Sequence, residues 1–172
     1  LFAKFRLPDE IQDLTDKRFL GVLPNLTETE NFKESINTVI TNLTSTLKQD
    51  EKVIMISGAL KGIGKTTTSI NIAKSLSGMG FKVLLMDCDM RRGDIHKEFN
   101  LHKGSLTDIQ DFNEGKFKQD KNLFVIPRIR EASDSPLSYF NSANFEKLIK
   151  ANRDNFDYII IDTPPVLAVS DA

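Results

Sequence analysis

A glycine-rich stretch between an apolar run and a helical pattern constrains this chain more than any other feature. Residues 59–66 read ALKGIGKT and match the pattern G-x-x-x-x-G-K-[ST], except that Ala59 replaces the first glycine. The preceding Val53–Ile56 is apolar without alternation, which is typical of a strand buried on both faces. A helical pattern from about Lys65 to Gly78 follows. Strand, loop and helix in this order predict a phosphate-binding loop, or P-loop, rather than an incidental glycine-rich turn.

The residues of this loop have the properties that phosphate binding requires. Small residues allow backbone N–H groups to curl around phosphate oxygens, and the N-terminus of the following helix adds partial positive charge there. We expect Lys65 to reach the β- and γ-phosphates and the Thr66 hydroxyl to hold a magnesium ion. The predicted ATP-binding residues are Ala59, Leu60, Lys61, Gly62, Ile63, Gly64, Lys65, Thr66 and Thr67.

Three further apolar runs alternate with helical patterns along the chain. They lie at Val83–Met86, Leu123–Ile126 and Tyr158–Ile161, and a helix is expected at Asn144–Arg153. Strands that alternate with helices imply right-handed crossovers between parallel strands. The sequence therefore predicts an α/β fold of the P-loop NTPase class, with a mainly parallel sheet and helices on both faces.

The segment before the loop predicts a linker and an amphipathic helix. Residues 1–18 show no clear period, and Phe19–Leu23 is a short apolar run that predicts an edge strand or a docked extended segment. Thr27 and Glu30 have the spacing of a capping box. Apolar residues then recur at steps of three and four, which is typical of one helical stripe. They are Phe32, Ile36, Val39, Ile40, Leu43 and Leu47.

Carboxylates follow two of the predicted strands. Asp87 and Asp89 close the second strand, and Asp162 closes the fourth. Ligands of open parallel sheets bind at the carboxyl ends of the strands, where carboxylates can hold magnesium directly or through water. Thr66, Asp87, Asp89 and Asp162 are therefore the predicted metal ligands, with Asp162 as the Walker B residue. For Asp89 alone, a turn-forming role is an equal alternative.

Two arginines follow these aspartates directly. Arg91 is expected to stabilise transition-state charge, with a solvated side chain as the alternative, whereas Arg92 is interpreted as a solvated side chain. The predicted catalytic residues are Lys65, Asp87, Asp89 and Arg91.

Composition narrows the class of function. The 23 Lys and Arg nearly balance the 24 Asp and Glu, which argues against a nucleic-acid-binding surface. No apolar run approaches the ~20 residues of a membrane span, and no secretory signal is visible. The single cysteine, Cys88, excludes an intrachain disulfide, fits a reducing compartment and is interpreted as a packing residue. His96 and His102 have no ligand-like partner set, so both are predicted at the surface.

Three segments resemble parts of the bacterial tyrosine kinases. Residues 83–91, VLLMDCDMR, are similar to the Walker A′ signature of that family, in which apolar residues precede Asp-x-Asp-x-Arg. Residues 160–172, IIDTPPVLAVSDA, are similar to its Walker B segment. Residues 19–24, FLGVLP, resemble the segment that links the last transmembrane helix to the kinase domain in the capsule and exopolysaccharide co-polymerase form. The resemblance covers roughly residues 19–172, and its paired Asp motifs are more specific than the P-loop alone.

The resemblance implies an activity, cofactors and partners. The family builds an autophosphorylating protein-tyrosine kinase on a deviant Walker P-loop sheet, related to partitioning and septum-placement ATPases. It implies ATP and Mg²⁺ as cofactors, Asp87 as the base or metal-bound acid, and Asp89 and Asp162 as the completion of the magnesium site. It further implies control of capsular or exopolysaccharide synthesis and export at the cytoplasmic face of the bacterial inner membrane. The implied partners are other copies in a ring, a C-terminal tyrosine cluster and the polysaccharide export machinery.

The resemblance also implies domain boundaries and shows departures. Residues 1–18 are expected to be a linker from a preceding membrane segment, since the chain opens with Leu1. Residues 19–172 are expected to be a kinase domain without its last strands and tyrosine cluster. The Glu-x-x-Arg-x-x-Arg pattern that the family uses for ring assembly corresponds here to Glu30, Lys33 and Ile36. Because both arginines are replaced, the sequence does not decide whether a ring forms or with what geometry. Lys61 precedes Gly62 as the signature lysine does in partitioning ATPases.

Two other classes of function stay open from the sequence. One is a partitioning or septum-placement ATPase whose nucleotide state switches dimerisation, which Lys61 favours. The other is a nucleotide-binding regulatory module with little turnover. The acceptor tyrosines are expected beyond Ala172, because Tyr158 lies in a strand predicted to be buried and Tyr139 stands alone in a predicted loop.

Overall fold

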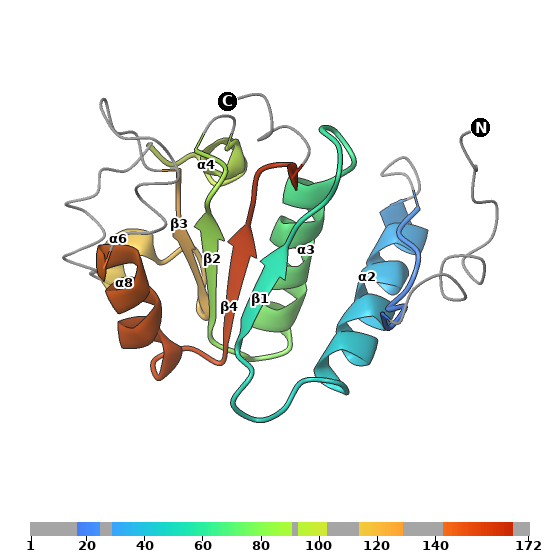
Figure 1. Cartoon of the computed structure of the whole chain (residues 1–172), viewed down its shortest axis with the longest axis horizontal. Helices are drawn as coiled ribbons and strands as arrows, with labels where there is room; N and C mark the ends of the chain where they lie inside the picture. The colour runs from blue at the N-terminus through green and yellow to red at the C-terminus, as the bar shows by residue number, and fades with distance from the viewer. Residues whose placement is uncertain (1–16, 25–28, 91–92, 103–113, 129–142, 167–172) are drawn as a thin grey trace. The chain divides into compact units, whose positions relative to one another are not determined.

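The computed structural model describes residues 17–24, 29–90, 93–102, 114–128 and 143–166 (Figure 1). The chain divides into two compact units, residues 1–48 and 49–172. The predicted linker boundary after residue 18 stays a prediction, because residues 1–16 lie outside the described part. In chain order the elements are α2 (Thr29–Thr44), β1 (Val53–Ile56), α3 (Lys65–Gly78), β2 (Val83–Asp87), α4 (Ile95–Glu98), α6 (Glu114–Phe117), β3 (Leu123–Ile126), α8 (Ala143–Arg153) and β4 (Tyr158–Asp162).

The second unit is built on a four-stranded sheet in the order β1-β4-β2-β3, and each neighbouring pair of strands is parallel. The predicted parallel α/β class is therefore confirmed. All four strands lie where their apolar runs predicted them, and β2 and β4 each extend one residue further, to Asp87 and Asp162. Because the strands run in the same direction, these two aspartates end at the same edge of the sheet.

Helices cover both faces of the sheet, as predicted (Figure 1). α3 buries Ile70, Ala73 and Leu76 and contacts all four strands. On the other face, Phe117 of α6 and Leu148 of α8 join a buried cluster with residues from β2, β3 and β4. Side chains of a strand alternate between faces, so the strands in the middle of the sheet are apolar at nearly every position.

β1 corrects the prediction of a strand buried on both faces. Ile54 is 8% exposed, whereas its neighbours Val53 and Met55 are 38% and 65% exposed. β1 lies at the end of the strand order and pairs with β4 alone in the described sheet. The apolar run therefore identified the strand correctly but not its place, because an edge strand can keep one covered and one open face.

The first unit contains α2 and the segment before it. Phe32, Ile36, Val39 and Ile40 of the predicted stripe are buried, while Leu43 is half-buried and Leu47 lies beyond the helix. Residues 17–24 form no strand, so the edge-strand prediction is wrong. They form the docked segment instead, because the Asn42 side chain donates a hydrogen bond to the Leu20 carbonyl at 2.8 Å. Thr27 of the predicted capping box lies outside the described residues.

The helices of the described part are too short or too polar to span a bilayer; none of them qualifies as a membrane crossing.

The covered inner strand β2 and the open edge strand β1 predict different responses to truncation. Leu84 of β2 is fully buried, whereas Met55 of β1 is 65% exposed. We expect Leu84→Ala to lower the free energy of unfolding by about 2–5 kcal/mol, because it leaves a cavity in the core. Met55→Ala should change it by less than about 0.5 kcal/mol. Urea unfolding followed by circular dichroism measures both, and equal losses would contradict the open face of β1.

Candidate nucleotide-binding site

The loop between β1 and α3 has the backbone that a P-loop requires. Gly62 and Gly64 have φ angles of 77° and 89°, in the left-handed region that glycine adopts readily. Among the described residues, Asn100 is the only non-glycine with a positive φ, so the backbone at Ala59 does not need glycine there. The replacement of the first glycine of the motif is thus compatible with the loop.

The N-terminus of α3 is open to an anion. Gly64 caps the helix without a side-chain hydrogen bond, and the first helical bond runs from the Thr68 N–H to the Gly64 carbonyl at 2.8 Å. The N–H groups of the first turn therefore point out of the helix, where its partial positive charge favours a phosphate. Residues 59–64 are exposed around this point.

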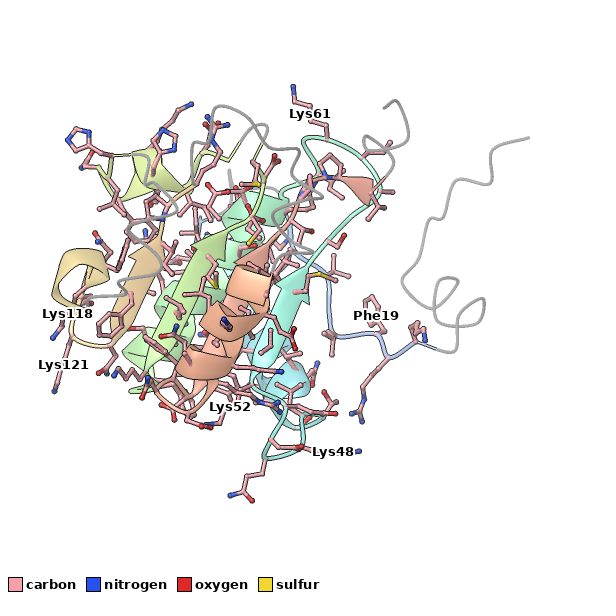
Figure 2. All side chains as sticks on the ribbon, turned by 60° about the vertical axis from the view of Figure 1, so that its left-hand side comes forward. Phe19, Lys48, Lys52, Lys61, Lys118 and Lys121 are labelled. Carbon is pink, nitrogen blue, oxygen red and sulfur yellow. The ribbon has the colours of Figure 1, made fainter. Side chains whose placement is uncertain are left out.

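The two lysines of the loop lie differently. Lys65 is half-buried, and its ammonium group donates to the Leu60 carbonyl at 3.1 Å, which closes the loop on itself. Lys61 is exposed, and Figure 2 shows its side chain projecting outward from the loop. Lys65 is thus the lysine whose ammonium group is held against the loop, and its predicted contact with the phosphates stays a prediction.

Asp162 lies directly behind the P-loop. Its side chain is fully buried, and its two carboxylate oxygens accept hydrogen bonds from the Thr66 hydroxyl at 2.8 Å and the Ser69 hydroxyl at 2.9 Å. Burial raises the pKa of Asp162, and these two hydrogen bonds oppose the rise. The structure therefore joins the predicted Walker B residue to the predicted magnesium-binding threonine, 96 positions apart.

Asp87 lies beside Asp162, because β2 and β4 pair with these residues in register. It is 4% exposed and accepts hydrogen bonds from the backbone N–H groups of Asp89 and Ile95, both at 3.2 Å. Burial, and next the charge of Asp162, raise the pKa of Asp87 to about 7. Two buried carboxylates side by side repel each other, and a cation between them would remove that repulsion.

The oxygen donors present fit a magnesium ion. The hydroxyl of Thr66 and the carboxylates of Asp87 and Asp162 are hard donors gathered at one edge of the sheet, and Mg²⁺ in proteins usually takes one or two carboxylates together with substrate phosphates. Within the described ranges there is no cluster of three or more His, Cys, Asp or Glu side chains that could hold a metal. The predicted participation of half-buried Asp89 in the metal site is thus not visible in the structure and stays a prediction.

The loop after β4 fastens this edge to the P-loop. The Thr163 hydroxyl donates to the Ile56 carbonyl at 2.8 Å, and the Val166 N–H donates to the Gly58 carbonyl at 3.0 Å. The Asp-Thr-Pro-Pro segment therefore holds the base of the P-loop against the end of β4.

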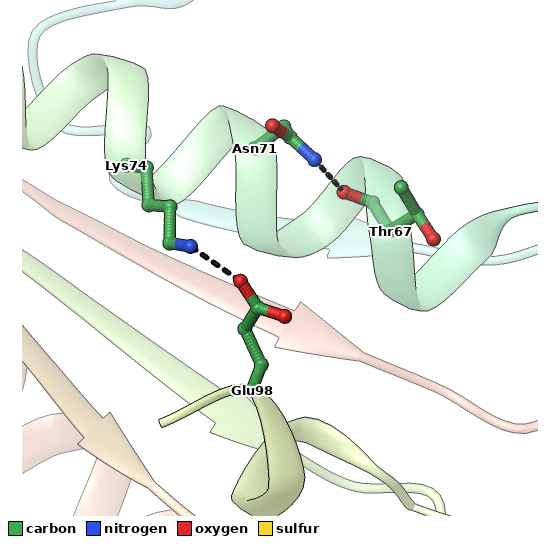
Figure 3. A network of polar contacts seen from close by, with 4 residues as sticks. All are labelled: Thr67, Asn71, Lys74 and Glu98. Atoms are coloured by element: carbon green, nitrogen blue, oxygen red, sulfur yellow. Dashed lines mark hydrogen bonds and ion pairs between the residues drawn. The ribbon is translucent and has the colours of Figure 1, made fainter. Parts of the chain in front are cut away.

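A second connection runs from α3 to α4 (Figure 3). Lys74 forms an ion pair with Glu98 at 2.6 Å and lies 5.2 Å from the centre of the Phe99 ring. Earlier in the same helix, the Asn71 side chain donates to the Thr67 carbonyl at 2.8 Å. α4 begins at Ile95, whose N–H holds Asp87, so α3 supports both carboxylates. Both ion-pair partners are half-exposed, and the pair itself stabilises the fold by at most about 1 kcal/mol.

The remaining predicted residues have mixed outcomes. Arg91 and Arg92 lie outside the described residues. Cys88 is a packing residue as predicted, since it belongs to the core cluster, and burial raises the pKa of its thiol. His102 is exposed as predicted, whereas His96 is half-buried and its Nδ1 is a buried atom without a hydrogen-bond partner.

The three residues at the positions of the ring-assembly pattern differ in their exposure to solvent. Glu30 and Lys33 are exposed on α2, whereas Ile36 is 1% exposed. Ile36 is therefore a core residue of this chain and is not available to a neighbouring subunit.

Two residues of the site were not predicted from the sequence. Ser69 lies three positions after Thr66, and this helical spacing, which puts both hydroxyls on one face of α3, is the signal that would have found it. Gly93 packs so closely on Asp87 that an added Cβ atom would collide with the carboxylate. Its N–H also donates to the Asp89 carbonyl at 2.7 Å.

Comparison with known proteins gives a consistent picture. The family model described as "AAA domain" matches residues 51–171. The chain is 38% identical over 149 residues to the tyrosine-protein kinase CpsD of Streptococcus pneumoniae serotype 4, an alignment that covers 81% of this chain. The chain spans 64% of the length of that relative.

Solved structures support the same fold. The kinase domain of VpsO superposes with a TM-score of 0.68 at 32% identity, over 81% of this chain and 71% of that domain. The septum site-determining protein MinD of Pyrococcus horikoshii, complexed with Mg-ADP, superposes with a TM-score of 0.50 at 26% identity, over 66% of this chain and 49% of MinD. The likeness is therefore broader to the VpsO kinase domain than to MinD.

The raised pKa of Asp87 predicts that the metal-free protein becomes less stable as the pH rises toward 7. The folded protein holds this proton up to a pH of about 7, against 3.8 for an ordinary Asp, so unfolding releases a proton between these values. The stabilisation is complete below about pH 4 and is lost as the pH rises through 7. About three pKa units set an upper limit of about 4 kcal/mol.

Urea unfolding from pH 4 to 8 in EDTA measures this pH dependence. In Asp87→Asn the loss of stability with pH should be clearly smaller, because the amide does not titrate. An unchanged pH dependence in that variant would show that Asp87 is not its source.

The close packing of Gly93 against Asp87 predicts that a side chain at position 93 destabilises the fold. Gly93→Ala should lower the free energy of unfolding by about 1–3 kcal/mol, because the added methyl group displaces the Asp87 carboxylate. Gly78→Ala is the matched control, since a Cβ there meets nothing within 4 Å, and it should be neutral or stabilising. Thermal unfolding of both variants checks the contrast; a stable Gly93→Ala protein would contradict the packing on Asp87.

Proposed function

This chain belongs to the bacterial tyrosine kinase family, and on that basis we propose that the protein transfers the γ-phosphoryl group of ATP to protein tyrosine in the control of capsular or exopolysaccharide synthesis and export. The observation that carries the proposal is the hydrogen bond between Thr66 and Asp162, with Asp87 alongside in register. It gathers oxygen donors at the edge of the sheet where the open N-terminus of α3 can receive phosphates.

Different residues of the P-loop are proposed to bind the phosphates and the magnesium ion. The N–H groups of the first turn of α3 would hold the phosphates of ATP, and the Lys65 ammonium group would leave the Leu60 carbonyl to bind the β- and γ-phosphate oxygens. The Thr66 hydroxyl would offer a lone pair to a magnesium ion while it keeps donating its hydrogen bond to Asp162. When bound, magnesium neutralises charge on the β- and γ-phosphates.

Asp87 is the residue that we assign to the reacting end of the site. Its raised pKa, at about 7, lies near neutral pH, where a general base both holds and releases protons efficiently. Asp87 therefore receives the proton of the acceptor hydroxyl or, with its charge stabilised by the cation, ligates the ion. Arg91 and Asp89 complete the proposed catalytic set.

The acceptor tyrosine belongs to another segment or another subunit. Tyr158 stands at the amino end of β4, whereas Asp162 stands at its carboxyl end, about 13 Å away at 3.3 Å per residue. The expectation that Tyr158 is buried on both faces is wrong: it is half-buried, with its ring packed edge-on against Phe81 at 5.2 Å. We therefore propose acceptors in a C-terminal tyrosine cluster of the protein, reached between subunits. Tyr139 lies outside the described residues.

The proposed setting follows from the same family. We place the kinase at the cytoplasmic face of the bacterial inner membrane, with the polysaccharide export machinery and other copies of the protein as partners. The burial of Ile36 leaves Glu30 and Lys33 as the residues of that pattern available for self-association.

A partitioning-type ATPase is the second candidate function. The exposure of Lys61, which projects from the P-loop, favours it, because a solvent-facing lysine at this edge can reach the phosphates of a facing subunit (Figure 2). In that case Lys61→Met abolishes nucleotide-dependent dimerisation and hydrolysis. A tyrosine kinase keeps phosphotyrosine formation in the same variant.

The proposal predicts a specific loss in Lys65→Met. Phosphotyrosine formation by the full-length protein with Mg-ATP should fall about 10²-fold or more, because the cation on the transferred phosphoryl group is gone. Lys118→Met, exposed and distant from Lys61 in Figure 2, is the charge-matched control and should be unaffected. An anti-phosphotyrosine blot measures both, and near wild-type phosphorylation in Lys65→Met would refute the assignment of the P-loop.

A further inference from the structure

Ser69 is a fully buried hydroxyl in the middle of α3. Its oxygen lies 2.9 Å from Oδ1 of Asp162 and 3.0 Å from the carbonyl oxygen of Lys65. Both neighbours are hydrogen-bond acceptors, and a serine hydroxyl has a single proton to donate. The hydroxyl therefore serves one of them at a time.

An ordinary explanation is the bond that serine often makes to the carbonyl four residues earlier in a helix. α2 shows this ordinary case at exposed positions, where Ser35, Thr38 and Thr41 donate to carbonyls four residues back. Ser69 differs because it is buried and has a carboxylate within reach. Hydrogen bonds to a charged acceptor are shorter and stronger than bonds to a neutral one, so the proton of Ser69 goes to Asp162.

As a consequence, both carboxylate oxygens of Asp162 accept a hydrogen bond. Thr66 donates to Oδ2 and Ser69 donates to Oδ1, from two hydroxyls on one face of α3. A carboxylate held by one donor can turn about its Cβ–Cγ bond, whereas two donors fix its plane. With Ser69 in place, one oxygen of Asp162 always faces the Thr66 hydroxyl.

We propose that Ser69 is a positioning residue for the magnesium site: it fixes Asp162 so that the carboxylate keeps hold of the Thr66 hydroxyl while this hydroxyl takes the ion. The inference rests on the proposed function, since it requires Mg-nucleotide binding at the P-loop. In this proposal Ser69 raises the affinity for magnesium, whereas the P-loop and Lys65 contact the nucleotide. Removing a residue that hydrogen-bonds to a metal ligand typically lowers the affinity for the metal by about 10- to 100-fold.

The test is a magnesium titration of the full-length protein with a fluorescent ADP analogue. In Ser69→Ala, the magnesium concentration at half-saturation should rise about 10- to 100-fold, while binding of the analogue in EDTA stays at the wild-type level. Ser77→Ala is the matched control, because Ser77 is a buried serine later in the same helix, and it should titrate like the wild type. Ser69→Cys, with similar volume and a weak donor, should lie between wild type and Ser69→Ala, and it replaces the alanine variant if that protein does not fold.

Combination with Asp162→Asn shows whether Ser69 acts through Asp162. In that background Ser69→Ala should add no further change in magnesium dependence. Three results would overturn the inference: a Ser69→Ala titration equal to that of Ser77→Ala, an equal loss of binding with magnesium and with EDTA, or an additive effect with Asp162→Asn. A wild-type protein that binds the analogue without any magnesium dependence would overturn the proposed function and this inference with it.

Discussion

The parallel pairing of β2 with β4 is the constraint on which the site depends. It places the carboxylates of Asp87 and Asp162 side by side, nearly without exposure to water. Two such groups are unfavourable together unless hydrogen bonds, a proton or a cation compensate. The backbone N–H groups around Asp87 and the hydroxyls around Asp162 supply part of this compensation. A magnesium ion with nucleotide phosphates would supply the rest, which links the architecture of the sheet to the proposed chemistry.

α3 carries or supports most residues of the site on one rigid element. Its first turn carries Lys65 and Thr66, its second turn carries Ser69, and Lys74 pairs with the helix that holds Asp87. The helix is packed on the sheet through Ile70, Ala73 and Leu76. Residues placed on such an element keep their separations, which phosphoryl transfer requires because the protein contributes mainly positioning and charge. Tyr158, in contrast, lies at the opposite end of its strand, and we therefore propose an acceptor from another segment or subunit.

The two leading functions share the fold and differ at the surface. The in-register aspartates and the fastened Asp-Thr-Pro-Pro segment are the features on which we base the proposal of a tyrosine kinase. The exposed Lys61 on the loop is the feature that favours a dimer-switching ATPase. A site behind the loop can be common to both, because it serves the nucleotide. In our proposal, residues in front of the P-loop therefore decide whether tyrosine or water is the acceptor.

The sequence by itself determined the elements and the loop. Apolar runs, glycine positions and the Asp motifs were sufficient to predict four strands, α3 with its bounds, the P-loop and the residues Thr66, Asp87 and Asp162, because these signals are local in the chain. The tertiary structure decided what depends on neighbours distant in sequence. It made β1 an edge strand with Met55 exposed, buried Ile36, left Tyr158 half-exposed, and brought Ser69 and Gly93 against the two carboxylates. The physical reason is that burial, strand order and the orientation of a carboxylate are properties of packing between elements, and a run of residues does not carry information about what will pack against it.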